Sequence, residues 1–345
     1  MSRSPTHMYA EAQEAAEAVR RQLNANAAPM AELGAILRRL QPRAVATVGR
    51  GSSDHAATFA QYLIETRLNV LTTSAAPSVS SLYHATPDMT GAVCLAISQS
   101  GQSPDLLTAV QGAKAAGAFV VVLVNDADSP LAGLADRVVP LHAGPELSVA
   151  ATKSYIASLS ALTHLVACWA EDAELQAALQ SLPDQLAQAF ALDWSAAGSA
   201  FVRAASLYIV GRGLGFAAAQ EIALKFKETC GLHAEAFSAA EVRHGPMALV
   251  GEGFPVLALA QDDESRAGVD ALVDEFTARR ARVFLAGGGG PQAAGVERLP
   301  ALQAHPAIEP ILYVQSAYRM INALSLARGF DPDRPPHLNK VTQTL

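Results

Sequence analysis

The chain has 345 residues, half of them apolar, and its 25 basic and 32 acidic side chains give a net charge of −7 with neutral histidines. An apolar fraction this high excludes global intrinsic disorder, because such a chain can bury large hydrophobic cores. The mildly acidic balance disfavours nucleic acids and anionic membranes as partners. At roughly 100–200 residues per domain, the length predicts two compact domains or one large one.

The first residues do not have the pattern of an export signal, because residues 1–23 carry several charges and lack a continuous apolar segment. No apolar run approaches the roughly 18 residues that a membrane span needs. The cysteines Cys94, Cys168 and Cys230 stand in apolar segments without a CxxC spacing. That setting is typical of buried thiols and not of a disulfide framework or a zinc site. We therefore expect a soluble, cytoplasmic protein.

An internal repeat organises the expected elements. After a helical arm over the first forty residues, an apolar run ends in Gly-Arg-Gly at 49–51 and leads into a helix, and the same pattern returns at 211–213. The first half is expected to form strands at Ala44–Gly51, Ala92–Ser98, Phe119–Asn125 and Arg137–Leu141, with helices at Ser53–Glu65 and Asp105–Ala116. Connecting helices follow at Ser154–Trp169 and Glu171–Phe190. The second half is expected to form strands at Leu207–Gly213, Phe254–Gln261, Arg282–Gly287 and Val296–Pro300, with helices at Phe216–Thr229 and Glu264–Arg280.

Near-continuous apolar strands that alternate with helices indicate parallel sheets with helices on both faces. We therefore predict an α/β fold of two tandem, doubly wound parallel-sheet domains. The expected boundaries are a helical arm over 1–40, a first domain over 41–192, a second domain over 193–330 and a tail over 331–345. The tail is rich in proline and polar residues, so we expect it to run extended over the surface.

A serine-rich turn follows the strand Ala92–Ser98, at the edge where sites of such sheets lie. It reads Ser98-Gln99-Ser100-Gly101-Gln102-Ser103, and Pro104 then begins a helix with Ser103 as its N-cap. A helix N-terminus with hydroxyl groups suits a phosphate dianion, although an ordinary capped turn is the alternative interpretation. Ser52 and Ser53 are expected to add donors from the neighbouring loop. The matching stretch of the second half, Gln261–Ser265, is acidic, so we expect one phosphate site, in the first half.

Proton-transfer side chains gather in the second half. The helix Phe216–Thr229 carries Lys225 and Glu228, which are three residues apart and therefore share one face. His233 and His244 follow in Gly-Leu-His and His-Gly-Pro contexts that predict loops. A solvated Lys/Glu helix face is the commoner meaning of such a pattern, but the histidines make the group suitable for general acid–base catalysis.

Four motifs in this order resemble those of tandem SIS (sugar isomerase) domains, and most closely the isomerase portion of glucosamine-6-phosphate synthase. The resemblance covers residues 44–345. The motifs are Ser98-Gln99-Ser100-Gly101, Lys225-Phe226-Lys227-Glu228, His233-Ala234-Glu235 and His244-Gly245-Pro246.

The resemblance implies roles for individual residues. The sugar 6-phosphate would be held by Ser52, Ser53, Ser98, Gln99, Ser100 and Ser103. Backbone groups of Val149 and its neighbours in Glu146–Thr152, Ala150 among them, would contact the sugar. Glu228 would move a proton between C2 and C1 with the support of Lys225, and Lys340 in the tail would approach the carbonyl end. His244 would assist ring opening from the partner subunit of a homodimer with a shared active site.

The chain departs from the synthase pattern in ways that shape the expected reaction. No cysteine precedes Cys94, and the forty-residue arm is too short for a glutaminase domain. We therefore expect an aminosugar-6-phosphate deaminase that converts glucosamine 6-phosphate and water into fructose 6-phosphate and ammonia, without a metal or other cofactor. The tail reads Pro336-His337-Leu338-Asn339-Lys340 where the synthases have Arg-Asn-Leu-Ala-Lys, which leaves the roles of His337 and Asn339 open.

Two alternatives remain beside this interpretation. One keeps the chemistry and changes the substrate to galactosamine 6-phosphate or to a fructosamine 6-phosphate that a deglycase cleaves. The other is a non-catalytic phosphosugar sensor, which the presence of Glu228, His244 and Lys340 disfavours. Two further features are interpreted as structural: Gly287–Gly290 as a flexible loop, and Cys230 as a packing thiol and not a nucleophile.

Overall fold

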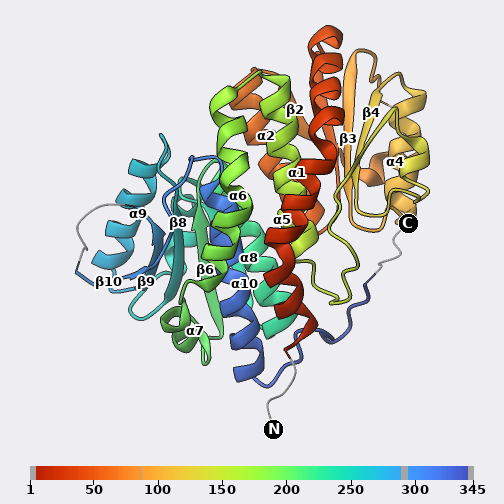
Figure 1. Ribbon diagram of the computed structural model, residues 1–345. Coiled ribbons are helices and arrows are strands. Elements are labelled where there is room, and N and C mark those ends of the chain that lie inside the picture. Colours follow the sequence, from red (N-terminus) through yellow and green to blue (C-terminus); the bar gives the residue numbers. More distant parts are fainter. Residues whose placement is uncertain (1–4, 86, 289–293, 341–345) are drawn as a thin grey trace. The chain divides into compact units, whose positions relative to one another are not determined.

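The computed structural model describes residues 5–85, 87–288 and 294–340 (Figure 1). The chain begins with α1 (His7–Leu40), and the first repeat then forms β1 (Ala44–Val48), α2 (Ser52–Leu68), β2 (Leu71–Ser74), α3 (Pro77–Ser81), β3 (Ala92–Ser98), α4 (Pro104–Ala115), β4 (Phe119–Val124) and β5 (Arg137–Pro140). The connecting helices are α5 (Lys153–Trp169), α6 (Ala173–Ala191) and α7 (Ser195–Phe201). The second repeat forms β6 (Ser206–Gly211), α8 (Leu214–Cys230), β7 (His233–Ser238), β8 (Pro255–Ala260), α9 (Arg266–Ala278), β9 (Arg282–Gly287), β10 (Val296–Leu299) and α10 (Glu309–Ala327).

Each repeat forms one five-stranded parallel sheet. The strand order is β2-β1-β3-β4-β5 in the first sheet and β10-β9-β8-β6-β7 in the second. Read from the opposite edge, the second order repeats the first strand for strand, which confirms the expected pair of doubly wound α/β domains. In the first sheet, Ala44 at the start of β1 pairs with Leu71 at the start of β2 on one side and with Ala92 at the start of β3 on the other.

Contacts divide the chain into two compact units, which we call the first and second lobes. The first lobe contains residues 15–146, 153–183 and the tail from 339, and the second lobe contains the residues up to 14, 147–152 and 184–338. The repeat suggested a separate arm over 1–40 and a separate tail from 331. These boundaries stay predictions. In the division by contacts, α1 contributes its first turns to the second lobe and the rest to the first, and the tail is divided at 338.

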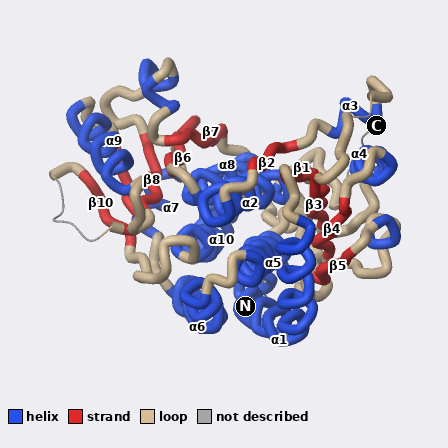
Figure 2. The backbone as a smooth tube through the Cα atoms, turned by 90° about the horizontal axis from the view of Figure 1, so that it is seen from above, coloured by secondary structure: helices blue, strands red, loops and turns tan. Residues whose placement is uncertain are grey.

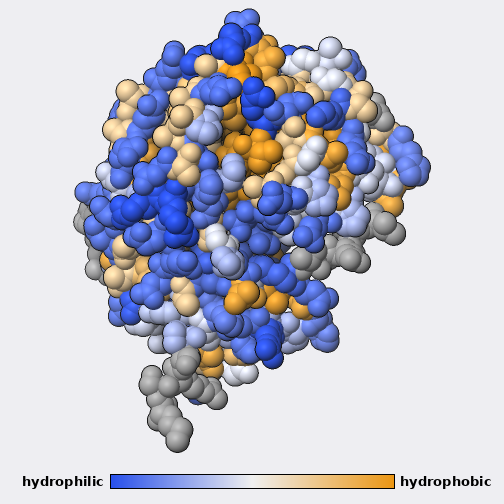
Figure 3. Space-filling model, turned by 45° about the vertical axis from the view of Figure 1, so that its right-hand side comes forward, coloured by the Kyte–Doolittle hydropathy of each residue, from blue (hydrophilic) through white to orange (hydrophobic). Residues whose placement is uncertain are grey.

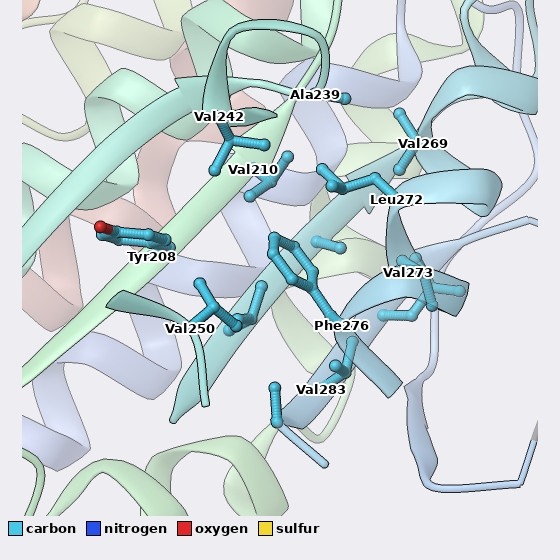
Figure 4. Packing of buried hydrophobic residues seen from close by; sticks show 14 of the residues in the cluster. Tyr208, Val210, Ala239, Val242, Val250, Val269, Leu272, Val273, Phe276 and Val283 are labelled. Atoms are coloured by element: carbon cyan, nitrogen blue, oxygen red, sulfur yellow. The ribbon is translucent and has the colours of Figure 1, made fainter. Parts of the chain in front are cut away.

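Helices cover both faces of each sheet (Figure 2). In the first lobe α4 lies on one side of the sheet and α5 on the other, and in the second lobe α9 lies opposite α8 and α10. The central strands β3 and β4 are apolar and almost wholly buried, as a sheet covered on both faces requires. In the second lobe, Phe276 of α9 packs against the sheet residues Val210 and Val283 (Figure 4).

Two strands, β2 and β7, lie outside the expected set. Both are edge strands, since β2 pairs with β1 and β7 pairs with β6. Each of them mixes polar with apolar residues and is only partly buried, so both lack the continuous apolar runs that mark central strands. The assignment of His233 to a loop is therefore wrong, because His233 is the first residue of β7.

None of the helices in the described part of the chain is long and apolar enough to cross a membrane. Figure 3 shows a face on which hydrophilic residues predominate and apolar groups form small patches. The segment Gly287–Gly290, which the sequence suggests is a flexible loop, lies partly outside the described residues. Of its described part, Gly287 ends β9 and Gly288 follows with a positive φ.

Candidate functional site

The serine-rich turn lies at the point where the strand order of the first sheet reverses. From β1 the chain goes to β2 on one side and then to β3 on the other, and such a switch point is where ligands of doubly wound sheets bind. Ser52 and Ser53 begin α2 after β1, and Ser98–Ser103 connects β3 to α4. The sequence-predicted phosphate residues therefore come to one edge of one sheet.

The turn itself is organised by its own hydroxyl groups. The Gly101 N–H donates to Ser98 Oγ at 2.9 Å, and the Gln102 N–H donates to Ser100 Oγ at 3.4 Å. Ser103 occupies the expected N-cap position of α4, but its hydroxyl makes no hydrogen bond to the helix. Its Oγ is thus not used for capping, at a helix N-terminus that favours anions.

Arg50 of the first Gly-Arg-Gly joins the loops that follow β1 and β3. Its Nε and Nη2 lie 2.9 and 2.7 Å from Oδ2 of Asp105, whose side chain is fully buried at the start of α4. The ion pair fixes the spacing of the two loops that carry the serines. It also offsets the charge of Asp105, which would otherwise weaken anion binding there.

Position 101 in the serine-rich turn requires glycine, both for its backbone conformation and because a side chain would clash with a neighbour. Its φ is +64°, and an added Cβ would lie 2.2 Å from Oγ of Ser129. We expect Gly101→Ala to raise the Kd for inorganic phosphate about tenfold or more, because strain of roughly 1–3 kcal/mol would distort the turn. Gly133→Ala is the matched control, since a Cβ there has open space. Isothermal titration of both variants checks this, and equal affinities would refute it.

The matching connection of the second sheet is organised by amide and acidic side chains. At its switch point, Gln261 Nε2 donates to the carbonyl oxygen of Arg212 at 2.7 Å. Asp263 Oδ1 accepts from the N–H and the hydroxyl of Ser265 before α9. These side chains therefore organise the turn, and the negative charge of Asp263 opposes phosphate.

A buried carboxylate–lysine cluster lies on α8. Lys225 Nζ lies 2.5 Å from Oε2 of Glu228 and 3.3 Å from Oε1 of Glu221. The hydroxyl of Tyr318 on α10 donates to Glu221 Oε1 at 3.2 Å. The side chains of Glu221 and Lys225 are buried, whereas that of Glu228 is 21% exposed. Of the two carboxylates in this cluster, Glu228 is thus the one whose side chain is partly exposed.

The two carboxylates keep Lys225 charged. Burial alone would lower the pKa of Lys225, but Glu221 and Glu228 outweigh burial and raise this pKa above its ordinary value. A raised pKa keeps Lys225 a cation near neutral pH, next to Glu228. Glu221 and Tyr318 were not among the residues predicted from the sequence. The spacing of Glu221 four residues before Lys225 was the available signal.

The two histidines of the expected acid–base set do not join this cluster. His233 is exposed at the start of β7, and His244 is exposed just after a 3₁₀ turn over Glu241–Arg243. Within the residues that the structure describes, neither imidazole forms a hydrogen bond or ion pair with Glu228. An exposed His244 is compatible with its expected role at a partner subunit, which stays a prediction.

The tail lysine meets the side chain of Glu146, a residue that was expected to contact the sugar only through its backbone. In the first lobe, Lys340 Nζ lies 3.0 Å from Oε2 of Glu146, whose side chain is fully buried. Glu146 also accepts from the Ser154 N–H at 3.1 Å and from the Ser154 hydroxyl at 2.7 Å, at the start of α5. Glu146 thus connects Lys340 of the tail to the start of α5.

Val149 and Ala150 lie in the loop before α5, in the second lobe. Val149 is half-buried, and its N–H donates to the carbonyl oxygen of Asp333 at 3.5 Å. Ala150 is buried.

Cys230 is buried beside the carboxylate–lysine cluster. Burial raises the pKa of its thiol to about 11, so the thiol stays protonated near neutral pH. This agrees with a packing role. Within the described ranges, no group of three His, Cys, Asp or Glu side chains is arranged to hold a metal ion.

Known proteins are similar to this chain in both sequence and fold. The SIS domain family matches residues 40–168 and 200–297. A glutamine–fructose-6-phosphate aminotransferase (isomerizing) of Aeropyrum pernix is 35% identical over 311 residues, which cover 85% of this chain and 50% of that protein. The chain thus spans about half the length of the curated relatives it matches.

Two solved structures agree over nearly the whole chain. A candidate phosphosugar isomerase of Silicibacter pomeroyi has a TM-score of 0.90 at 44% identity, covering 95% of this chain and 100% of that one. The C-terminal domain of a glucosamine-fructose-6-phosphate aminotransferase of Francisella tularensis has a TM-score of 0.85 at 25% identity, covering 97% and 100%.

Proposed function

This chain belongs to the SIS domain family, and we propose that within it the chain acts as an aminosugar-6-phosphate deaminase. The proposed reaction converts glucosamine 6-phosphate and water into fructose 6-phosphate and ammonia. The similarity of the chain to phosphosugar isomerases supports an enzyme of the isomerase type. Deamination is the specific step that we add, and it needs water as its one co-substrate.

The observation that carries the proposal is the ion pair of Glu228 with the buried Lys225. In the open-chain aldehyde, the C2–H bond is acidic because the carbonyl at C1 accepts the electron pair. Glu228 removes this proton while O1 takes up a proton from solvent, which leaves an enolamine. Return of the proton from Glu228 to C1 then gives an iminium at C2. Water adds to C2, one of its protons moves to nitrogen, and ammonia leaves as the C2 hydroxyl loses its remaining proton to solvent and becomes the carbonyl. A carboxylate held in place by a cation suits this proton transfer.

The remaining residues take complementary parts in the proposal. The serine-rich turn and Ser53 bind the phosphate, and backbone groups near Val149 contact the sugar. Lys340 approaches the carbonyl end. His244 assists ring opening from the partner subunit of a homodimer.

The test is to incubate the purified chain with glucosamine 6-phosphate and to measure ammonia and fructose 6-phosphate together. Release of both in a 1:1 ratio is the expected result. No turnover of glucosamine 6-phosphate, together with turnover of galactosamine 6-phosphate or of a fructosamine 6-phosphate, would change the assigned substrate to the one that is turned over. Binding without turnover of any of the three would contradict an enzyme and favour a phosphosugar sensor.

A further inference from the structure

The first turn of α1 is capped from the far end of the chain. The first N–H groups of a helix lack partners within the helix and must find them elsewhere. The N–H groups of His7 and Met8 donate to the two carboxylate oxygens of Asp333, each at 2.7 Å. The Tyr9 N–H donates to Oγ1 of Thr6 at 3.2 Å. A carboxylate here also interacts favourably with the helix dipole, so Asp333 anchors the tail to α1.

One turn further along α1, Glu11 anchors a second segment. Its side chain is buried, and it accepts the N–H groups of Leu147 and Ser148. The next N–H, that of Val149, donates to the backbone oxygen of Asp333 at 3.5 Å. Three consecutive N–H groups of this loop are therefore held by Glu11 and by the tail residue that caps α1.

Both anchored segments lead directly to groups of the proposed site. The loop 147–149 continues into Ala150, and the residue before it is Glu146, which pairs with Lys340 within the first lobe. The tail reaches Lys340 seven residues after Asp333. An anchor at Asp333 thus limits the positions that Lys340 can reach. The anchor at Glu11 limits the movement of residues 147–150, which we call the sugar loop because they are proposed to contact the sugar.

We propose that Glu11 and Asp333 are positioning residues that fix the sugar loop and the root of the catalytic tail onto the start of α1. The inference rests on the proposed function for the roles of Val149 and Lys340. The anchors themselves follow from the contacts above. Misplacing a reacting group by about 1 Å can cost on the order of a hundredfold in rate, so such anchors act on turnover more than on phosphate binding.

The test compares Asp333→Ala, Asp333→Asn and Glu11→Gln with the controls Arg334→Gln and Glu17→Gln. Arg334 is exposed in the same tail, and Glu17 is exposed on the same helix. We expect the three anchor variants to lower kcat by roughly 10–100-fold while the Kd for inorganic phosphate changes less than about threefold. Asp333→Asn keeps one acceptor oxygen and should lie between Asp333→Ala and the wild type.

Two readouts do not depend on turnover. Amide hydrogen exchange in peptides covering 144–152 and 329–340 should become about tenfold faster in Asp333→Ala, and in Glu11→Gln over 144–152. Acylation of Lys340 by acetic anhydride, followed by mass spectrometry, should also accelerate in Asp333→Ala. The two controls should match the wild type in both measurements.

The outcomes separate this inference from the proposed function. Unchanged exchange and unchanged Lys340 acylation in the anchor variants would overturn the inference, even with an active deaminase. Faster exchange with wild-type kcat would also overturn it, because the anchors would then be structural. In a chain that turns over no aminosugar phosphate, the exchange and acylation data still decide whether the anchors hold the two segments.

Discussion

Replacing Glu228 with glutamine is expected to lower kcat for glucosamine 6-phosphate by about 10²–10⁴-fold, the usual range for loss of a general base. At 1.36 kcal/mol per tenfold, this is roughly 3–5 kcal/mol of transition-state stabilisation. Glutamine has nearly the same shape but accepts no proton at neutral pH, so the change removes the chemistry and spares the geometry. Steady-state kinetics with coupled detection of ammonia measure the effect.

Binding separates a catalytic role of Glu228 from a structural one. The proposed phosphate-binding serines belong to the first lobe and Glu228 to the second, so the Kd for inorganic phosphate should stay within about threefold of wild type in Glu228→Gln. Lys227→Gln is the matched control, because Lys227 is the preceding residue on α8 and is exposed. Loss of phosphate binding with an unchanged kcat would rule out Glu228 as the base.

Much of the fold follows from local sequence patterns. The central strands are continuous apolar runs, such as Phe119–Val124, that contrast with the amphipathic helices around them. The repeated Gly-Arg-Gly marks the duplication in the sequence, and the identical strand orders of the two sheets agree with it. The position of the serine-rich turn was equally predictable, because Ser98 ends a strand, Ser103 is an N-cap and Pro104 begins the next helix.

The rest depends on contacts between residues that are distant in sequence. Asp333 caps a helix that begins more than three hundred residues earlier, and Tyr318 reaches Glu221 from another helix. Neither contact leaves a periodic signal, because each needs the tertiary fold to bring its partners together. The edge strand β7 was missed for a related reason. Its pairing with β6, and not an apolar run, makes it a strand.

The buried cluster on α8 makes Lys225→Met the substitution with the largest expected effect on stability. Removing one partner of a buried ion pair leaves an uncompensated charge, which typically costs about 3–5 kcal/mol in the free energy of unfolding. Here the carboxylate that loses the Lys225 cation is Glu221, whose side chain is fully buried and which accepts a hydrogen bond from the Tyr318 hydroxyl. Urea unfolding followed by circular dichroism measures the difference.

A second variant shows whether the charge of Glu221 is the cause. Glu221→Gln combined with Lys225→Met removes both buried charges, so it should recover at least half of the loss seen with Lys225→Met alone. A loss in Lys225→Met that the second substitution leaves unchanged would point to packing and not to charge. A loss below about 1 kcal/mol would contradict the buried cluster itself.

The pH dependence of this loss has a definite sign. The pKa of folded Lys225 lies above its ordinary value of 10.5. The stability that its charge contributes is therefore fully present below that ordinary value and is lost only as the pH rises through the higher folded pKa. Between pH 6 and 9, the stability difference between wild type and Lys225→Met should thus be flat as far as Lys225 is concerned. A difference that fell steeply in this range would mean that the lysine loses its proton there. Glu228 would then lack the fixed cation on which its proposed role as a base depends.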